Sequence, residues 1–225
     1  MQSSGIGPTL YIAHESDLIP LSLVNILLKY ADDTNLLVPE NTDIRIPQEF
    51  DNIKTWAFHN KMTVNFSKTK EIVFFRPNPY RSVHPLPVDD IEQLLEAKVL
   101  GVILNGKFHF DSHLQFIIRQ CSQRLYLMKL LRNQGLPPKQ MGIVFQAIIM
   151  SRIQYAISAW GGFVHSDWKR KIDVLLLRAY RSGLSGLCTD LTFDSLLFAA
   201  DQTLFTAMCN YEHCLHPIAA AMKSS

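Results

Sequence analysis

The sequence lacks any continuous apolar run of about 18 residues, the length that a membrane-spanning helix needs. It also lacks a basic N-terminal stretch followed by an apolar core, so its start does not have the pattern of a signal peptide. Charged residues make up only 19% of the chain, whereas hydrophobic residues make up 48% and the mean hydropathy is +0.06. We therefore expect no membrane partner, and the surplus of apolar side chains predicts surfaces that associate with a further polypeptide segment.

Cysteine is scarce as well, and the four residues, at positions 121, 188, 209 and 214, lack the spacing of a disulfide framework. Cys209, His213 and Cys214 lie close together in the sequence and, with Cys188, form one candidate zinc site. No CxxC pair is present, however, and reduced thiols in an intracellular compartment explain the cysteines more simply. We expect free thiols and an intracellular location, either nuclear or cytoplasmic.

Two adjacent acidic residues, Asp32 and Asp33, lie between the apolar runs 23–30 and 34–38. A short polar interruption between two strand-like runs predicts a β-hairpin whose turn carries the carboxylates. Mg²⁺ prefers carboxylate oxygens, and one or two carboxylates plus substrate phosphates are its usual ligands in proteins. The pattern therefore fits a metal site for phosphoryl transfer, although an Asp pair is also ordinary in a solvated turn.

The residues around this pair resemble a known family. Tyr30-Ala31-Asp32-Asp33-Thr34-Asn35-Leu36-Leu37 is similar to the signature of reverse transcriptases (RNA-directed DNA polymerases) from non-LTR retrotransposons, the LINE class, of the jockey-like type. Further segments resemble motifs of that family in the expected order: Gln2 to Leu10 (motif B), Trp56-Ala57, Asn60 to Met62 and Asn65 to Glu71 (motif D), Leu100 to Leu104 with Phe108 and His113 (primer grip and thumb entry), and Cys121 to Arg124 and Ser151 to Ala156 (the helices that follow).

The resemblance implies an α+β fold, in which residues 1–112 form the C-terminal part of a polymerase palm. Residues 113–225 would form a basic helical thumb with a C-terminal helical extension. The family has a third metal-binding acid on an earlier strand, motif A, so the chain is expected to be a truncated polymerase that lacks this strand and the fingers. In motif B the family has Gly after the Gln, whereas this chain has Ser3. Glycine would let the backbone approach a template base or nucleotide closely, so the serine puts that contact in doubt.

The same resemblance implies roles for individual residues. Asp32 and Asp33 would hold Mg²⁺ and serve catalysis, and Lys68 would neutralise or protonate the leaving pyrophosphate, because a cation there stabilises developing negative charge. A surface Lys in a polar turn is the plainer interpretation of Lys68. The expected substrate-binding residues are Gln2 in motif B, Tyr30 beside the primer end, and Leu100 and Gly101 in the primer grip.

Charge is unevenly distributed along the chain. Residues 1–112 carry a net charge of −4, residues 113–189 carry +9 and residues 190–225 carry −3. The middle segment has eleven Lys and Arg residues against two acidic ones, a balance typical of proteins that bind a phosphate backbone, although solvated helix faces are the alternative. The expected nucleic-acid-binding residues are Arg119, Arg124, Lys129, Arg132, Lys169, Arg170 and Lys171.

Periodicity predicts helices over 44–60, from an Asp111 or Ser112 cap to about 135, from Pro137 to about 160, from a Ser166 cap to about 182, and over 193–208. Apolar stripes are expected at Leu114, Ile117, Ile118, Cys121, Leu125 and Met128, at Met141, Val144, Phe145 and Ile148, and at Trp168, Ile172, Leu175, Leu176 and Ala179. Strands are expected over 71–75 and 98–104, and Asn105-Gly106 predicts a hairpin turn leading into 107–110.

Three functions remain open from the sequence. The chain is part of a reverse transcriptase and is inactive alone, because motif A and the fingers are missing. Alternatively it is a non-catalytic remnant that binds a primer–template duplex of RNA or DNA, or it is a translated transposon relic without a selected role. Self-association, or pairing with a missing palm and fingers half, is a further possible partnership.

Overall fold

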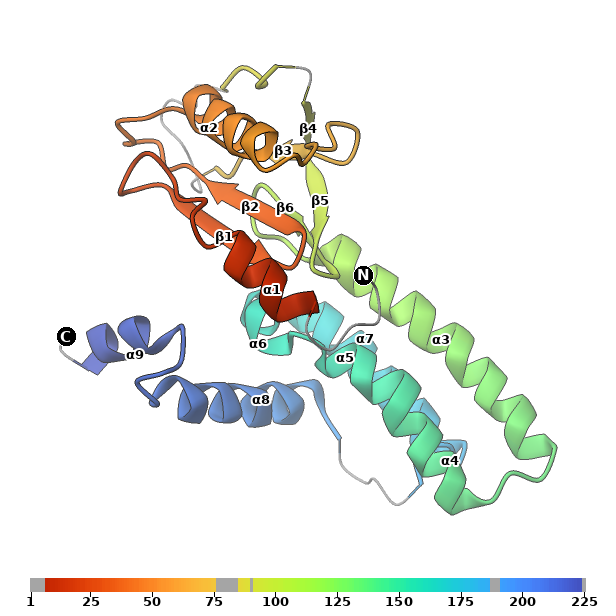
Figure 1. The fold of residues 1–225 in the computed structure, drawn as a ribbon. Coiled ribbons are helices and arrows are strands. Elements are labelled where there is room, and N and C mark those ends of the chain that lie inside the picture. The colour runs from red at the N-terminus through yellow and green to blue at the C-terminus, as the bar shows by residue number, and fades with distance from the viewer. Residues whose placement is uncertain (1–6, 76–84, 90, 187–190, 224–225) are drawn as a thin grey trace. The chain divides into compact units, whose positions relative to one another are not determined.

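The computed structural model describes residues 7–75, 85–89, 91–186 and 191–223, and the chain separates into two compact units (Figure 1). Unit 1 contains the described residues up to Val73 and from 85 to 94. Unit 2 contains Phe74, Phe75 and the residues from 95 onward. This division by compactness does not coincide with residue 112, where the sequence places the end of a palm, so that functional boundary stays a prediction.

Unit 1 is built from short elements: α1 (Gly7–His14), β1 (Ile26–Tyr30), β2 (Asp33–Leu37), α2 (Ile46–His59), β3 (Lys70–Ile72) and β4 (Glu92–Leu94). β1 pairs with β2 in antiparallel fashion, and β3 pairs with β4 in parallel fashion. The core is small, with Phe50, Val88 and Ile91 buried against Ile46 and Val64. β4 was not predicted, and β3 ends at Ile72 rather than at residue 75.

The β1–β2 hairpin is present where the sequence predicts it. Tyr30 pairs with Asp33 and Ile26 with Leu37, so Ala31 and Asp32 form a two-residue turn. Ala31 has a φ of 51°, in the left-handed region that a non-glycine residue occupies at a cost of about 1–2 kcal/mol. The hairpin therefore holds Asp32 in the turn and Asp33 at the first position of β2.

A buried carboxylate fixes the segment that enters β1. Glu49 of α2 is 1% exposed and accepts hydrogen bonds from the backbone N–H of Leu21 (2.9 Å) and Ser22 (2.8 Å) and from the Asn25 side-chain amide (2.8 Å). Burial raises the pKa of Glu49, but the hydrogen bonds from Leu21, Asn25 and Ser22 outweigh it and the pKa lies below its ordinary value. One side chain thereby connects helix α2 to the start of the hairpin.

Unit 2 begins with a second hairpin, β5 (Glu96–Val99) and β6 (Val102–Asn105). The prediction of one strand over 98–104 with a turn at Asn105-Gly106 is wrong, because the turn lies at Leu100-Gly101. Both turn residues have positive φ, 45° and 90°, the conformation whose twist suits a two-residue hairpin. Asn105 instead ends β6, where its side-chain oxygen accepts from the N–H of Lys107 and of His109.

Helices make up the rest of unit 2. They are α3 (Asp111–Asn133), α4 (Pro138–Phe145), the π-helix η1 (Gln146–Met150), α5 (Ser151–Gln154), α6 (Ile157–Trp160), the 3₁₀ turn η2 (Gly161–Phe163), α7 (Ser166–Arg181), α8 (Phe193–Met208) and α9 (His216–Lys223). α8 has the bounds that the sequence predicts, whereas α9 was not predicted. In Figure 1, α3 runs beside α4 and α7, with which it is in contact.

Three details of these helices correct the sequence analysis. The N-cap of α3 is Phe110 and that of α7 is His165, so Asp111 and Ser166 are the first helical residues rather than caps. The Asp111 carboxylate accepts instead from Trp168 Nε1 at 2.5 Å. The helix expected from Pro137 to 160 widens into a π-turn at η1 and breaks at Tyr155-Ala156, where Ala156 has a φ of 51°.

The predicted apolar stripes form one core. Buried residues from all three stripes join it, together with Ile149, Met150, Ile153, Trp160 and Phe193. Ile118, Val144, Ile148 and Trp168 are only partly buried and pack at its edge. Phe145, Trp160 and Phe193 are 0% exposed, and burial of each aromatic side chain stabilises the fold by roughly 1.5–3 kcal/mol.

One helical stretch of the described residues, Pro138–Phe163, is long and apolar enough to cross a membrane. Its side chains Met141, Phe145, Ile149 and Ile153 lie in the core of unit 2. Packing against α3 and α8 therefore uses part of its apolar surface, and the expectation of no membrane partner stays a prediction.

His113 is a buried titratable group beside this core. It is 3% exposed, its Nδ1 accepts the Ile103 N–H at 3.4 Å, and its ring lies edge-on to Trp160 at 5.2 Å between centroids. Burial, with a smaller contribution from the charge of Lys98, lowers the pKa of His113 to about 4. The folded state therefore holds a neutral imidazole.

We expect His113 to make the chain less stable in mild acid. In the unfolded chain His113 has a pKa near 6.5 and binds a proton below that pH, whereas in the folded state it binds a proton only near pH 4. Stability is then complete above about pH 6.5 and falls by up to about 3 kcal/mol as the pH drops toward 4. Urea unfolding of His113→Gln should show a shallower pH dependence over this range, whereas exposed His59→Gln should match the parent. Equal pH dependence in all three proteins would contradict this account.

Glu49→Gln should destabilise unit 1 by about 1–3 kcal/mol, because an amide –NH₂ would face donors that now meet a carboxylate oxygen. Since the pKa of Glu49 is lowered, its contribution is present above about pH 4.3, the unfolded value, and disappears as the pH falls through the folded pKa. Exposed Glu40→Gln serves as the control. Protease resistance of unit 1 measures the effect, and equal resistance of both variants at neutral pH would show that the network is dispensable.

Candidate metal and nucleic-acid site

The tip of the β1–β2 hairpin is open to solvent. Tyr30 is 65% exposed, and Ala31, Asp32 and Asp33 are exposed as well. Lys29 Nζ donates to the Glu15 backbone oxygen just after α1, and Tyr11 Oη donates to the Glu15 carboxylate at 2.6 Å. Burial, the Glu15 hydrogen bond and the charges of Glu15 and Asp32 raise the pKa of Tyr11. Asp32 therefore lies within electrostatic range of α1.

Asp32 and Asp33 are the metal-binding residues that the sequence predicts. Their oxygens are the ligand type that Mg²⁺ prefers. However, no group of three or more His, Cys, Asp or Glu residues is placed to hold a metal within the described ranges. Asp32 and Asp33 therefore belong to no larger ligand group in this part of the chain, and Mg²⁺ binding stays a prediction. The candidate zinc ligands Cys209, His213 and Cys214 form no such group either, and Cys188 lies outside the described residues.

Lys68 lies in the turn before β3. Its backbone N–H donates to the Asn65 backbone oxygen at 3.1 Å, and the residue is exposed. It belongs to the same unit as Asp32 and Asp33, but in the described part of the chain it forms no ion pair with either carboxylate. Its role at the leaving group stays a prediction. Gln2 lies outside the described residues.

The predicted primer-grip residues Leu100 and Gly101 form the turn of the β5–β6 hairpin and contact Tyr155. Tyr155 Oη donates to the Leu100 backbone oxygen at 2.7 Å. A Cβ atom at Gly101 would lie 3.2 Å from the Tyr155 ring, and the φ of 90° also favours glycine. The turn is therefore held against the break after α5.

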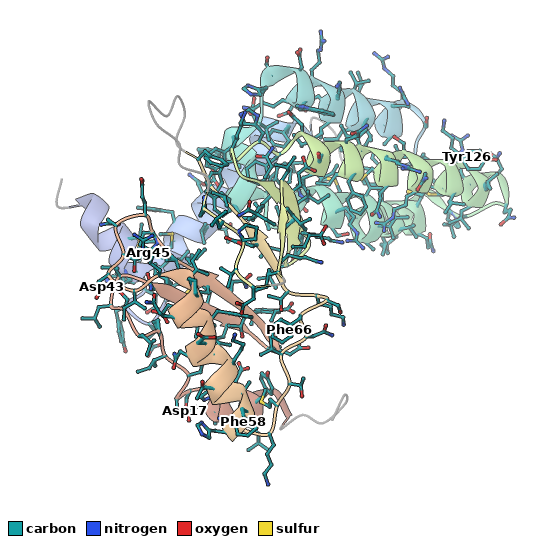
Figure 2. The ribbon with its side chains drawn as sticks, turned by 90° about the horizontal axis from the view of Figure 1, so that it is seen from above. Asp17, Asp43, Arg45, Phe58, Phe66 and Tyr126 are labelled. Carbon is teal, nitrogen blue, oxygen red and sulfur yellow. The ribbon has the colours of Figure 1, made fainter. Side chains whose placement is uncertain are left out.

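The basic residues of α3 are less free than their sequence positions indicate. Arg124 is half-buried and its Nη1 donates to the Ile148 backbone oxygen at 2.6 Å, and Arg132 Nη1 donates to the Ser182 backbone oxygen. Arg119 is exposed and Lys129 is half-buried. Tyr126, labelled in Figure 2, is 63% exposed on the same helix. Arg124 and Arg132 therefore connect α3 to other segments while keeping further N–H donors.

The basic run at the start of α7 is partly committed as well. Lys169 forms an ion pair with Asp194 of α8 at 2.8 Å, and Arg170 lies 3.6 Å from Asp167. Lys171 Nζ lies 3.7 Å from the centroid of the Trp168 ring. Lys169 thus joins α7 to α8, whereas Arg170 and Lys171 are exposed and are better placed to meet a phosphate.

Two features were missed by the analysis of the sequence. Residues 113–166 contain six Lys and Arg residues and no Asp or Glu, a stricter charge pattern than the eleven-to-two balance of 113–189. Arg152, exposed on α5, belongs to this acid-free segment and was not among the predicted binding residues. Counting acidic residues in a moving window would have found the segment, whereas the buried contacts of Glu49 leave no trace in the sequence.

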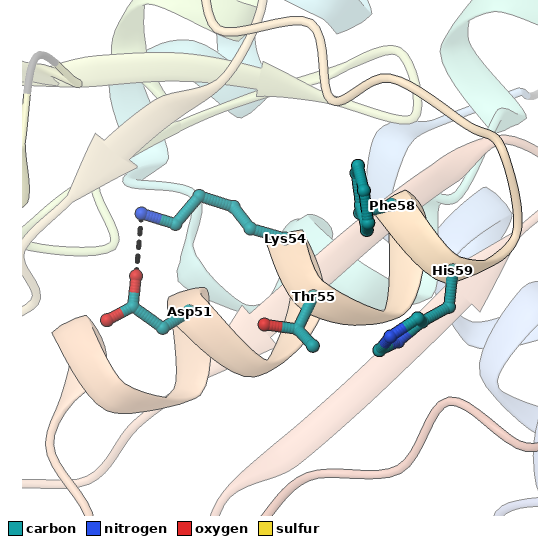
Figure 3. Close-up of a pocket in the computed structure, with 5 residues that line it drawn as sticks. All are labelled: Asp51, Lys54, Thr55, Phe58 and His59. Atoms are coloured by element: carbon teal, nitrogen blue, oxygen red, sulfur yellow. Dashed lines mark ion pairs between the residues drawn. The ribbon is translucent and has the colours of Figure 1, made fainter.

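A shallow hollow on α2 is lined by Asp51, Lys54, Thr55, Phe58 and His59 (Figure 3). Its cation is already neutralised, because Lys54 Nζ lies 2.6 Å from Asp51 and 2.9 Å from Asp89. This hollow therefore offers little attraction for an anion.

No family model matches the chain, and no solved structure gives a significant match. Among curated proteins, the chain is 28% identical over 196 residues to the "Probable RNA-directed DNA polymerase from transposon BS" of Drosophila melanogaster. The match covers 80% of this chain but only 22% of that protein, so the chain spans about a fifth of the length of the relative. The similarity supports a relationship between this chain and the reverse transcriptase of a transposon.

Proposed function

We propose that the chain is part of a reverse transcriptase of the non-LTR, LINE-class and jockey-like retrotransposons. In this proposal residues 1–112 correspond to the C-terminal part of the palm and residues 113–225 to the thumb and its extension. The observation that carries it is the position of Asp32 and Asp33 at the exposed tip of a hairpin, in a chain whose sequence is similar to a transposon RNA-directed DNA polymerase.

The geometry of the hairpin supports this assignment. Ala31 has a strained backbone, and such strain is concentrated at functional sites and turns. The Glu49 network fixes the strand entry that leads to the tip. A bound Mg²⁺ would neutralise charge on the transferred phosphates, while Asp32 and Asp33 supply oxygens, Lys68 a cation, and Tyr30 an exposed ring beside the primer end.

A polypeptide of these 225 residues should not extend a primer on an RNA template with Mg²⁺ or Mn²⁺. Two-metal chemistry clamps both the attacking and the leaving oxygen, and Asp32 and Asp33 lack a third carboxylate partner in the part of the chain that the structure describes. The assay is a gel-based extension of a labelled primer, with binding of the same primer–template as proof that the protein is folded. Extension that Asp32→Ala abolishes would overturn the proposal of inactivity.

Nucleic-acid binding is the second part of the proposal, and it also covers the case of a non-catalytic remnant. The helices of unit 2 commit their apolar faces to one core, so the basic residues of an acid-free segment remain near the surface. Long-range attraction of phosphates depends on such an uncompensated positive field. The duplex would be the primer–template that the parent family copies.

Binding of a fluorescent duplex should fall steeply with salt and depend little on sequence. Contact with four phosphates gives a slope of about −3.6 for log affinity against log salt on B-form DNA, from about −0.9 per phosphate. The double change Arg170→Gln and Lys171→Gln should weaken binding equally on all sequences, without breaking the Lys169–Asp194 ion pair. Lys107→Gln, an exposed change outside the basic segment 113–189, is the control. An affinity that stays flat across salt concentrations would refute the binding function.

A further inference from the structure

A hollow of about 570 Å³ lies in unit 2 between α3 and the stretch η1–α5. Its lining includes Arg124 and Leu127 of α3, Ile148 of η1, and Ser151, Arg152 and Tyr155. All of these residues belong to the same compact unit. Two guanidinium groups therefore border one concave surface.

One of these arginines is fixed and the other is available. The hydrogen bond from Arg124 Nη1 to the Ile148 backbone oxygen, at 2.6 Å, holds Arg124 against the wall of the hollow. A guanidinium has five N–H donors, so this bond leaves donors for a ligand. Arg152 is exposed, and its guanidinium group forms no ion pair or hydrogen bond with the described residues. Both arginines also influence one buried neighbour: burial raises the pKa of Cys121 to about 11, and the two positive charges oppose that rise.

The positive charge of the hollow is not neutralised locally. No Asp or Glu occurs between positions 113 and 166, and neither arginine takes part in an ion pair in the described part of the chain. Each arginine fork matches the geometry of a phosphate and can bind it with two parallel hydrogen bonds. Charge complementarity therefore favours a dianionic or monoanionic oxygen ligand.

Tyr155 joins the hollow to the β5–β6 turn. Its hydroxyl donates to the Leu100 backbone oxygen and its ring packs where Gly101 has no side chain. Together with Leu127, which is 55% exposed, the tyrosine ring gives the hollow an apolar wall. A ligand that combines an anion with a less polar sugar would contact both kinds of surface, which an isolated carboxylate would not.

We propose that this hollow is a phosphate-binding subsite for the backbone of a nucleic-acid duplex, with Arg124 and Arg152 as the ligands of one phosphate. The proposal rests on the nucleic-acid binding proposed above and adds a defined contact point, with Arg152 as a new binding residue. The neighbouring Leu100-Gly101 turn would then lie beside the same strand.

The decisive variant is Arg152→Gln, because Arg152 has no partner in the described structure whose loss would disturb the fold. Loss of one phosphate contact should reduce the steepness of the salt dependence by about 0.9 and weaken binding at moderate salt by about five- to tenfold. The thermal midpoint should stay unchanged. The control is Lys139→Gln, which removes the same charge from an exposed position of the acid-free segment outside the hollow.

The outcomes separate the two proposals. If the parent binds duplex with steep salt dependence and Arg152→Gln behaves like Lys139→Gln, the subsite is refuted while nucleic-acid binding stands. If the parent does not bind duplex, both fail. Polyglutamate serves as a competitor at a charge concentration equal to that of the duplex. If polyglutamate displaces the duplex, and Arg152→Gln weakens the binding of polyglutamate as much as that of the duplex, the hollow binds acidic protein segments instead. A five- to tenfold weaker duplex affinity with a shallower salt dependence in Arg152→Gln, but not in Lys139→Gln, supports the phosphate subsite.

Discussion

The packing of α3, α4 to α6 and α7 around Phe145 and Trp160 determines the surface of unit 2. These two side chains are fully buried, and Cys121, Met128 and Ile153 complete the contact between the helices. Once the apolar stripes face this core, the arginines of an acid-free segment must lie near the surface or at its edge. Arg124 lies at that edge, where it satisfies the Ile148 carbonyl group. The same packing therefore creates the fold, the positive field and the hollow beside Arg152.

The periodic features of the fold could be predicted from the sequence, and the local interruptions could not. The α3 stripe from Leu114 to Met128 and the bounds of α8 follow from 3.6-residue periodicity. The turn at Leu100-Gly101 was missed because Asn105-Gly106 is the stronger local signal, whereas Tyr155, 55 residues away, holds Leu100. The break at Ala156 was missed for a similar reason, since its left-handed backbone depends on tertiary contacts that no window of sequence contains.

In the candidate site, too, the features set by local sequence could be predicted and the long-range contacts could not. The polar pair between two strand-like runs is enough to predict that Asp32 and Asp33 lie at a hairpin, because that pattern is local. The engagement of Arg124, Arg132 and Lys169 with partners 24, 50 and 25 residues away was not predictable. Glu49 is the least predictable of these residues, because a glutamate in the first turn of a helix is usually exposed. Only the fold shows that its carboxylate accepts hydrogen bonds from the segment that precedes β1. Sequence thus identified the residue types, and the structure identified which of them are already occupied.

The central claim is that nucleic acid binds the acid-free helical surface of unit 2. Hydrogen exchange of the chain, measured with and without a primer–template duplex, tests it most directly because it maps binding onto individual segments. The account predicts slower exchange in the peptides around Arg119 to Arg124 and 147–155, and little change in the peptides of α8. Saturating binding that leaves both segments unchanged, or that protects α8 instead, would contradict it.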